Sequence, residues 1–318
     1  MALVTDLVGV AFETTYGTAA SISNFVPVRQ IRPEVAENTR IYDDTLLSRF
    51  GAERHRLTTK DVVGDTTGYV YPDSVGWWLK GLLGSVSSSI ASGESVVYEH
   101  TFTQADTLPS MTMVINDTEP RQITGLVINT GTFEFQEGIM TLANGFLAQD
   151  LSDVSEEFPV ISELIDPFTF PNFTVRIAND IASALASSAI PLDEWEMNYG
   201  NNVAKSNHIG TRTISFLNPT KTTCGGVFRR YAEDETLIDY TRNASEVALV
   251  FEATGASIGN NEQYSLQIHI PRAVMTRTIR PYEAGSIIME ETTFSALRDT
   301  SEGYSVKMIL TNKVENYN

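Results

Sequence analysis

The segment TFEFQEGIMTL, residues 132–142, decides the fold of this 318-residue chain. Apolar and polar residues alternate on both sides of Glu137-Gly138, which is the pattern of two strands that each turn one face to a core. Gly138 can adopt the positive φ that a tight hairpin turn requires. The segment therefore predicts an antiparallel β-hairpin.

The same period of two recurs along most of the chain. It is found in residues 110–116, 172–177, 247–251, 264–270 and 306–310. Only two segments favour helices: residues 72–83, with apolar residues at helical spacing, and residues 231–242, with acidic residues in the first turn. We therefore expect a mainly β protein in which helices are few.

The two predicted helices have similar neighbours in the sequence. Each is followed by two alternating strands and then by a long strand with a return strand, at 126–135 with 140–146 and at 287–294 with 304–310. This order predicts a divergent internal duplication, with a first domain at residues 1–155 and a second at 156–318. A chance match between β-rich segments is the alternative.

The acidic composition excludes some classes of function. The chain has 22 Lys and Arg against 40 Asp and Glu, a net charge of −18. A protein that grips nucleic acid needs clustered basic residues, so this balance argues against that function. We also expect no signal peptide and no membrane span, because no run of about 18 apolar residues occurs.

Motifs for catalysis or cofactor binding are missing from the sequence. Phosphate-binding loops, nucleophile elbows and zinc-protease motifs are absent. The single cysteine, Cys224, has no base nearby in sequence and excludes an intrachain disulfide. The histidines lie far apart, at His55, His100, His208 and His269. We therefore predict no enzyme, no catalytic residues, no cofactor and no metal.

The residues GVAFETTYGTAA, 9–20, resemble the N-terminal signature of the tail tube proteins (major tail proteins) of long-tailed, non-contractile bacteriophages. Other features resembling that family follow in order: a charged segment at 34–61, a lone helix ending in Leu82-Leu83-Gly84, His100-Thr101-Phe102, the phrase Gly125-Leu126-Val127-Ile128, and Ile270-Pro271. The resemblance covers most of the chain.

The resemblance implies a structural virion protein. Its expected fold is a β-sandwich or barrel with one flanking helix, which joins neighbours into a closed β-barrel ring, and the rings stack into a tube that conducts DNA. The expected partners are other copies of the chain, a tape measure protein, a tail terminator and distal tail proteins, with double-stranded DNA passing without specific binding. The expected location is the virion tail, after synthesis in the host bacterial cytoplasm.

The duplication departs from the family pattern of one tube domain per chain and six chains per ring. Two tandem tube-like domains imply homotrimeric rings with pseudo-sixfold symmetry. A homohexameric ring is the alternative if the repeat is illusory.

Two groups of residues are candidates for the tube's functions. Acidic and polar residues of the long hairpins are expected to line the lumen and repel DNA phosphates: Asn129, Glu134, Gln136, Glu137, Glu290, Glu291, Thr293 and Ser295. Strand alternation allows only one parity on that face, so we expect about half of them to point elsewhere. The charged segment, expected to be an irregular loop, supplies candidates for contact between rings: Arg40, Asp43, Asp44, Arg49, Glu53, Arg54, Arg56 and Lys60.

Two alternative functions fit the same composition. One is another β-rich virion protein, such as a tail terminator or a capsid-decoration subunit. The other is a carbohydrate-binding β-sandwich that uses Trp77 or Trp195 as a sugar platform.

Overall fold

The computed structural model describes residues 7–42, 54–91, 96–116, 119–155, 158–159, 165–259, 262–282, 285 and 287–317. The first half contributes ten strands and one helix: β1 (Leu7–Phe12), β2 (Asn24–Pro27), β3 (Gln30–Tyr42), β4 (Arg54–Tyr69), α1 (Val75–Leu83), β5 (Gly84–Ile90), β6 (Tyr98–Gln104), β7 (Met111–Ile115), β8 (Arg121–Gln136), β9 (Ile139–Ala148) and β10 (Asp150–Asp153).

The second half adds nine strands, two short helices and a 3₁₀ turn. They are η1 (Phe170–Asn172), β11 (Phe173–Ala178), α2 (Ile181–Ala186), β12 (Glu194–Gly200), β13 (Ala204–Ser206), β14 (Phe216–Asn218), β15 (Thr223–Tyr231), α3 (Thr236–Arg242), β16 (Glu246–Gly259), β17 (Glu262–Ile279), β18 (Met289–Ala296) and β19 (Lys307–Asn312). The mainly β fold is confirmed.

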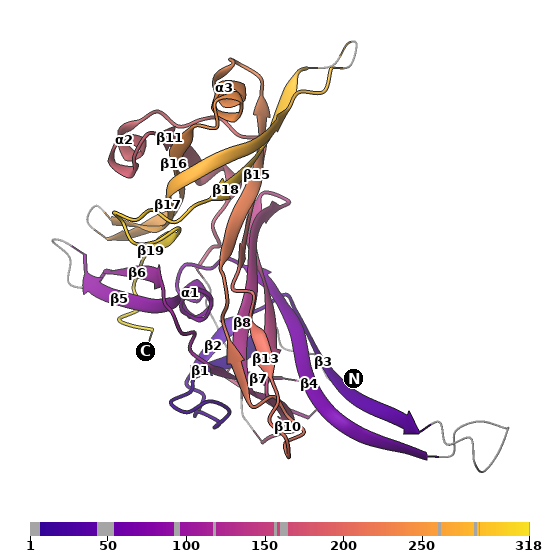
Figure 1. Ribbon diagram of the computed structural model, residues 1–318. Coiled ribbons are helices and arrows are strands. Elements are labelled where there is room, and N and C mark those ends of the chain that lie inside the picture. Colours follow the sequence, from indigo (N-terminus) through magenta and orange to yellow (C-terminus); the bar gives the residue numbers. More distant parts are fainter. Residues whose placement is uncertain are drawn as a thin grey trace.

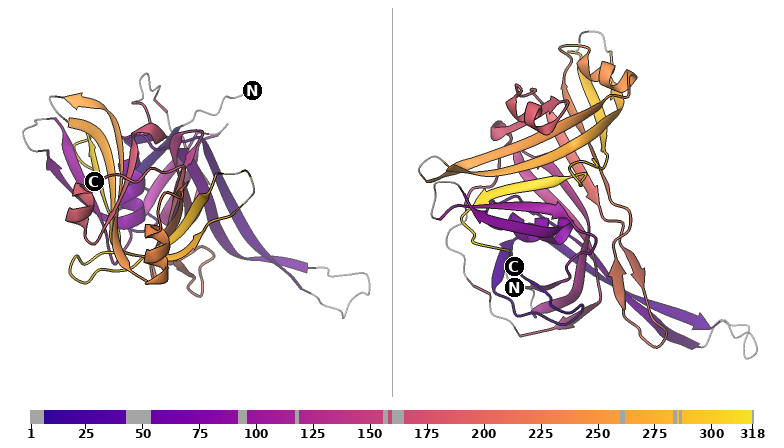
Figure 2. Two further views of the ribbon diagram at one scale, coloured as in Figure 1. Left: turned by 90° about the horizontal axis from the view of Figure 1, so that it is seen from above. Right: turned by 60° about the vertical axis from the view of Figure 1, so that its left-hand side comes forward.

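One long antiparallel sheet, here called the main sheet, runs through both halves in the order β3–β4–β9–β8–β12–β15–β18–β17. Figure 1 shows it extending from the projecting β3–β4 hairpin to the end of β17 and β18. Strands β8 and β17 are long enough to leave the main sheet and enter two further sheets. The first part of β8 pairs with β7 and β10, and the first part of β17 pairs with β16 and β19 (Figure 2).

The order of strands repeats within the main sheet. The series β3–β4–β9–β8 is followed by β12–β15–β18–β17, in which each strand has the same neighbours as its counterpart. In β4–β9, Gly64 lies opposite Phe146, and in β15–β18, Gly226 lies opposite Phe294. A Cβ on either glycine would lie within 2.9 Å of the facing ring, so both positions require glycine for close packing.

A β-bulge marks the same place in the two outer strands of these series. It lies between Ile128 and Thr130 in β8 and between Met275 and Arg277 in β17. The bulges and the glycine–phenylalanine pairs together match residues of the first series with residues of the second.

The junction between the two series is a strand pair within the chain. Residues of β8 pair with β12 from Thr130 opposite Gly200 to Glu134 opposite Glu196. The outer edges are different. Among the described residues, β3 pairs only with β4, and residues 277–279 of β17 pair only with β18.

The hydrophobic core is continuous across both halves. Helix α1 lies in its centre, where Leu82 packs on Gly131 of β8. The helix ends at Gly84, whose φ of 100° is one that glycine adopts without strain. The chain end returns to the same place, because the Tyr317 ring contacts the rings of Trp77, His100 and Phe102.

Several local predictions need correction. The strand over 287–294 does not form a hairpin with 304–310: β18 and β19 each pair with β17 instead. The helix predicted at residue 231 begins at Thr236, because β15 stays paired with β18 through Tyr231. Helix α2 was not predicted at all, although the Asp180 side chain accepts a hydrogen bond from the Ser183 amide and caps it.

The charged segment at residues 34–61 is also not irregular where the structure describes it. Its two sides are continuous with β3 and β4, paired as far as Tyr42 opposite Arg54. Charged residues on both faces of this hairpin hide the alternation, since neither face of its outer part meets a core.

Tyr317 provides a test of how the chain end stabilises the first half. Its ring is buried, its hydroxyl accepts a hydrogen bond from Asn312, and its carbonyl accepts one from Lys80. We expect Tyr317→Ala to lower the free energy of unfolding by about 3–5 kcal/mol, the usual cost of removing a buried aromatic ring. Urea unfolding of the variant measures this.

The matched control is Tyr282→Ala, because the Tyr282 side chain is exposed. Its effect should stay within about 0.5 kcal/mol, as for ordinary surface substitutions. Equal effects of the two substitutions would contradict the assigned role of Tyr317.

Candidate functional site

The main sheet has one apolar face and one polar face. In β8, Phe133 points into the core, while Thr132 and Glu134 point to the opposite side. In β12, Trp195, Met197 and Tyr199 are buried, so the intervening residues face away from the core. We call the outward side of the main sheet the polar face.

Cross-strand pairing places five of the predicted lumen residues on the polar face. Glu134 lies opposite Glu196, and the row continues through Val227 to Thr293. Neighbouring rows carry Glu291 opposite Arg229 and Ser295 opposite Gly225. Directly paired residues share a face, as do residues two apart in one strand. The five residues brought together are Glu134, Gln136, Glu291, Thr293 and Ser295.

Strands β12, β3 and β4 contribute polar-face residues that sequence reasoning missed. The signal was the alternation of Glu194, Glu196 and Asn198 with large apolar residues in residues 194–200. The further residues of this face with acidic side chains are Glu34, Asp61, Asp65, Glu194 and Glu196.

Hydrogen bonds orient the acidic side chains along the polar face. The side-chain Nε2 of Gln136 donates to Glu134 Oε1 at 2.6 Å, and the side-chain Nδ2 of Asn198 donates to Glu196 Oε1 at 2.6 Å. Arg229 lies between Glu194 of β12 and Glu291 of β18 in the sheet, and its Nη1 donates to Glu194 Oε1 at 3.2 Å. The same pairing places Arg32, opposite Asp65, and Arg277, opposite Thr293, on this face. Among the described residues of the face, carboxylates still outnumber guanidinium groups.

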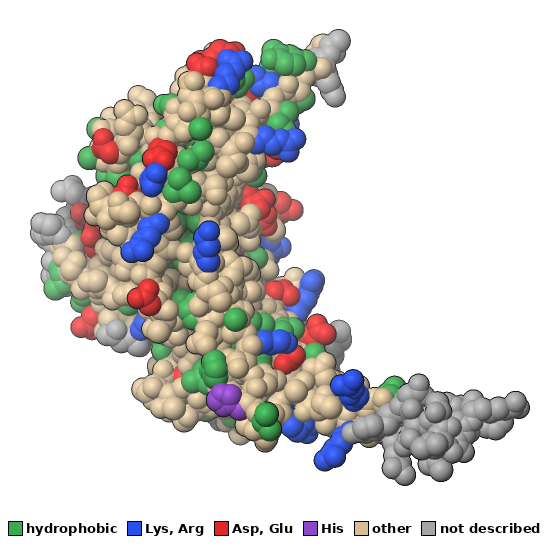
Figure 3. All heavy atoms as spheres, viewed as in Figure 1, with side chains coloured by type: hydrophobic (Ala, Val, Ile, Leu, Met, Phe, Trp, Pro, Cys, Tyr) green, Lys and Arg blue, Asp and Glu red, His purple; other side chains and the backbone are tan. Residues whose placement is uncertain are grey.

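The polar face lies on the hollowed side of the molecule. Figure 3 shows a concave outline between the end of the second series and the β3–β4 arm, and both acidic and basic side chains project along it. The helices and the sheets that contain β7 and β16 lie on the opposite side of the main sheet (Figure 1), whereas Lys205 of the β13–β14 hairpin pairs with Asp61 of the polar face at 2.6 Å.

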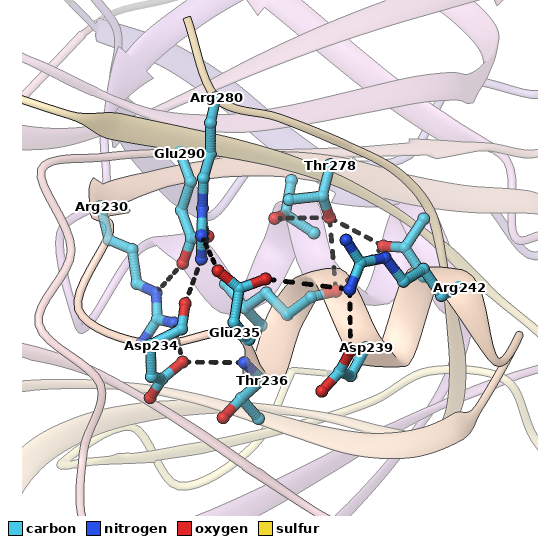
Figure 4. A network of polar contacts seen from close by, with 12 residues as sticks. Arg230, Asp234, Glu235, Thr236, Asp239, Arg242, Thr278, Arg280 and Glu290 are labelled. Carbon is cyan, nitrogen blue, oxygen red and sulfur yellow. Dashed lines mark hydrogen bonds and ion pairs between the residues drawn. The ribbon is translucent and has the colours of Figure 1, made fainter. Parts of the chain in front are cut away.

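Glu290 is adjacent to Glu291 in β18, so its side chain points to the core side of the main sheet, where it is buried. Its carboxylate accepts a hydrogen bond from Arg230 Nε, and Arg280 Nε donates to it at 2.9 Å (Figure 4). Arg230 also pairs with Asp234 at 2.9 Å, and Arg280 pairs with Glu235 at 2.6 Å. Because two arginines neutralise it inside the fold, Glu290 offers no free charge to the polar face.

The remaining two lumen candidates occupy special backbone positions. Glu137 lies in the β8–β9 turn with a φ of 52°, next to Gly138 with a φ of 81°. Asn129 forms the bulge of β8, where its Oδ1 accepts a hydrogen bond from the Val203 amide at 2.7 Å. Asn129 therefore anchors the chain after β12.

The inter-ring candidates lie on the β3–β4 hairpin, which projects from the body as an arm (Figure 1). Arg40 lies opposite Arg56 near its outer part, and Lys60 forms an ion pair with Asp150 nearer the body. Arg54 is the first residue of β4. The other four candidates, Asp43, Asp44, Arg49 and Glu53, lie outside the described residues.

Cys224, His269 and the two tryptophans considered as a sugar platform are buried. Burial raises the pKa of the Cys224 thiol to about 12, so the nucleophilic thiolate is not available. Burial, with Lys307 nearby, lowers the pKa of His269 to about 4. The indole rings of Trp77 and Trp195 are buried among other aromatic rings, so neither offers an exposed sugar platform.

Two further features are absent from the described part of the chain. No helix there has both the length and the hydropathy to cross a bilayer. No group of three or more His, Cys, Asp or Glu there is placed to hold a metal ion.

Comparison with known proteins identifies the family. No curated protein matches the chain. A family model described as phage tail tube protein matches residues 6–296, which is nearly the whole chain. The chain therefore belongs to the phage tail tube protein family and is a structural, non-enzymatic protein of the virion tail.

Proposed function

We propose that this protein polymerises as stacked rings and that its polar face lines the channel through which DNA leaves the virion. The observation that supports this is the concave, carboxylate-rich face of a sheet whose other face is buried in the core. Among the described residues of this face, carboxylates outnumber the arginines Arg32, Arg229 and Arg277, so the face as a whole does not attract phosphates. Carboxylates repel the DNA backbone, so the duplex slides without adhering.

The open edges of the main sheet support closure of the ring. An unpaired edge exposes backbone N–H and C=O groups that can join another chain. The internal β8–β12 pair provides a template, because β17 is the counterpart of β8 and β3 is the counterpart of β12. In the ring, residues 277–279 of β17 pair with residues 34–36 of β3 in the next chain, and the joined sheets form a closed barrel.

The repeated strand order supports three chains per ring. Each chain then supplies two tube-like domains, 1–155 and 156–318, and three chains supply six in a pseudo-sixfold arrangement. The alternative, six chains per ring, leaves each chain a smaller share of the circumference. A trimeric ring carries three times the net charge of −18.

The β3–β4 arm is proposed to contact the adjacent ring. Arg40 and Arg56 of the arm are exposed, whereas the chain that forms a neighbouring ring carries a net negative charge. Opposite charges attract across such a contact, with a strength that falls as salt is added. The tape measure, tail terminator and distal tail proteins are proposed partners from the family, and synthesis in the host bacterial cytoplasm precedes assembly.

Charge reversal on the polar face tests the channel role. The triple variant Glu134→Lys, Glu196→Lys and Glu291→Lys should slow or block DNA ejection from phage particles whose tails look normal, because lysines bind phosphates. The rate is measured by dye release of DNA from purified virions.

The control variant reverses three exposed carboxylates away from the polar face, at Glu99, Glu119 and Glu315. Its ejection rate should equal that of the unaltered phage. If the triple variant on the polar face also ejects DNA at the normal rate, the channel role is wrong.

Cysteine pairs test the ring junction and count its chains. By the template pair Thr132–Asn198, Ile279 of one chain lies opposite Glu34 of the next. Residues opposite each other in antiparallel strands are about 4.5–5.5 Å apart between Cα atoms, within disulfide range. Oxidation of the Ile279→Cys, Glu34→Cys variant should give a ladder on a non-reducing gel that ends at three chains.

A ladder that continues to six chains would support the hexameric ring instead. The mismatched pair Ile279→Cys, Gln30→Cys is the control and should cross-link poorly. Cross-linking of both pairs to the same extent contradicts the proposed register.

Removal of the arm tests stacking. Deletion of residues 40–54 should leave folded rings that fail to form tubes, as seen by negative-stain microscopy. Deletion of residues 92–95, between β5 and β6, is the control and should leave tube formation intact. Normal tubes from the arm deletion would overturn the stacking role.

A further inference from the structure

The strand pair β4–β9 of the first series corresponds to the pair β15–β18 of the second series. The two pairs are covered differently where β4 and β15 end. At the end of the first series, Met140 is only 1% exposed because Phe168 lies beside it. The Phe168 amide donates to the Val70 carbonyl at 3.1 Å, and the Met140 amide donates to the Phe168 carbonyl at 2.9 Å. Two residues on, the Phe170 amide donates to the Gly138 carbonyl at 2.8 Å. Residues 168–170 therefore close this end as a short added strand.

The matching end of the second series has the same backbone geometry. The Val70 amide donates to the Met140 carbonyl at 2.9 Å, and its counterpart, the Ala232 amide, donates to the Ile288 carbonyl at 3.0 Å. This correspondence follows from the glycine–phenylalanine pairs, since Val70 and Ala232 each lie six residues after the glycine. Met140 and Ile288 each lie six residues before the phenylalanine.

Nothing in the described chain covers the second end. Ile288 is 42% exposed, and its neighbours Ile287 and Tyr231 are 72% and 49% exposed. Within the described residues, neither the Ile288 amide nor the Ala232 carbonyl has a backbone partner like Phe168. Apolar side chains and backbone groups together thus form an open seat, here called the distal seat (Ala232, Ile287, Ile288 and Tyr231).

The topology indicates which segment fits the distal seat. Residues 168–172 cover the first end and then enter β11, which pairs with β16, the neighbour of β17. The counterpart of β11 is β1, which pairs with β7, the neighbour of β8. The segment that enters β1 is residues 1–6, MALVTD, and its first four residues are apolar.

We propose that residues 1–6 of a second copy of this chain occupy the distal seat of the first copy. The segment forms the bridge to Ile288 and Ala232 that Phe168 forms to Met140 and Val70, and its apolar side chains cover Ile287 and Tyr231. One junction of the ring is thus closed by the covalent linker and the other by an N-terminal clasp. This inference rests on the ring of the proposed function.

Truncation and a seat variant test the clasp. Protein lacking residues 2–6, and separately Ile288→Asp, should form rings only at a protein concentration at least ten times that of the unaltered chain, measured by sedimentation velocity. Ile209→Asp is the matched control, because Ile209 is fully exposed on the β13–β14 connection. Circular dichroism checks that each variant is folded.

A cross-link makes the test independent of folding defects. Thr169 bridges Ile139, and their counterparts are Ala2 and Ile287. Ala2→Cys combined with Ile287→Cys should give disulfide-linked chains upon oxidation, while Ala2→Cys combined with Ile209→Cys should not. Rings that form at the normal concentration without residues 2–6, or the absence of the Ala2–Ile287 cross-link in assembled rings, would overturn the clasp and leave the tube role intact. Failure of the unaltered protein to form any ring would overturn both.

Discussion

Apart from the outer part of the β3–β4 hairpin, strand alternation divides the strands of the main sheet between an apolar face, packed on α1 and the neighbouring sheets, and a polar face on the other side. Phe133 and Trp195 point into the core, and Glu134 and Glu196 therefore point out of it. A shift of one residue in the register would exchange these two sets, so core packing also fixes which groups form the polar face. The character of the polar face is thus a consequence of the same packing that folds the chain.

The two ends of the main sheet give the chain its tendency to assemble. Inside the molecule, β8 and β12 satisfy each other's backbone groups, whereas the outer edges of β3 and of residues 277–279 in β17 are open among the described residues. The corresponding apolar side chains also differ in burial: Met140 in the first series is buried, and its counterpart Ile288 in the second series is exposed. The described edges of an isolated chain therefore lack the backbone pairing and apolar cover that its centre has, and in the proposed ring another copy supplies them.

Local patterns in the sequence predicted what depends on neighbouring residues. The hairpin at 132–142, the helix ending at Gly84 and the parity of Glu134 and Gln136 all follow from spacing within a few residues. Pairing between distant strands could not be predicted in this way. The placement of β12 between β8 and β15 joins residues about 60 positions apart, and Glu290 could not be recognised as buried until Arg230 and Arg280 were brought to it. The error over 287–294 and 304–310 has the same origin, because two alternating strands close in sequence need not pair.

The central claim is that the polar face lines the bore of a ring closed through β17 and β3. Electron cryomicroscopy of tubes assembled from the purified protein tests it most directly. The account predicts three chains per ring, a continuous barrel with β17 of one chain beside β3 of the next, and Glu134, Glu196 and Glu291 on the inner surface. A tube with these carboxylates on its outer surface, or a bore lined by lysine and arginine, would contradict it.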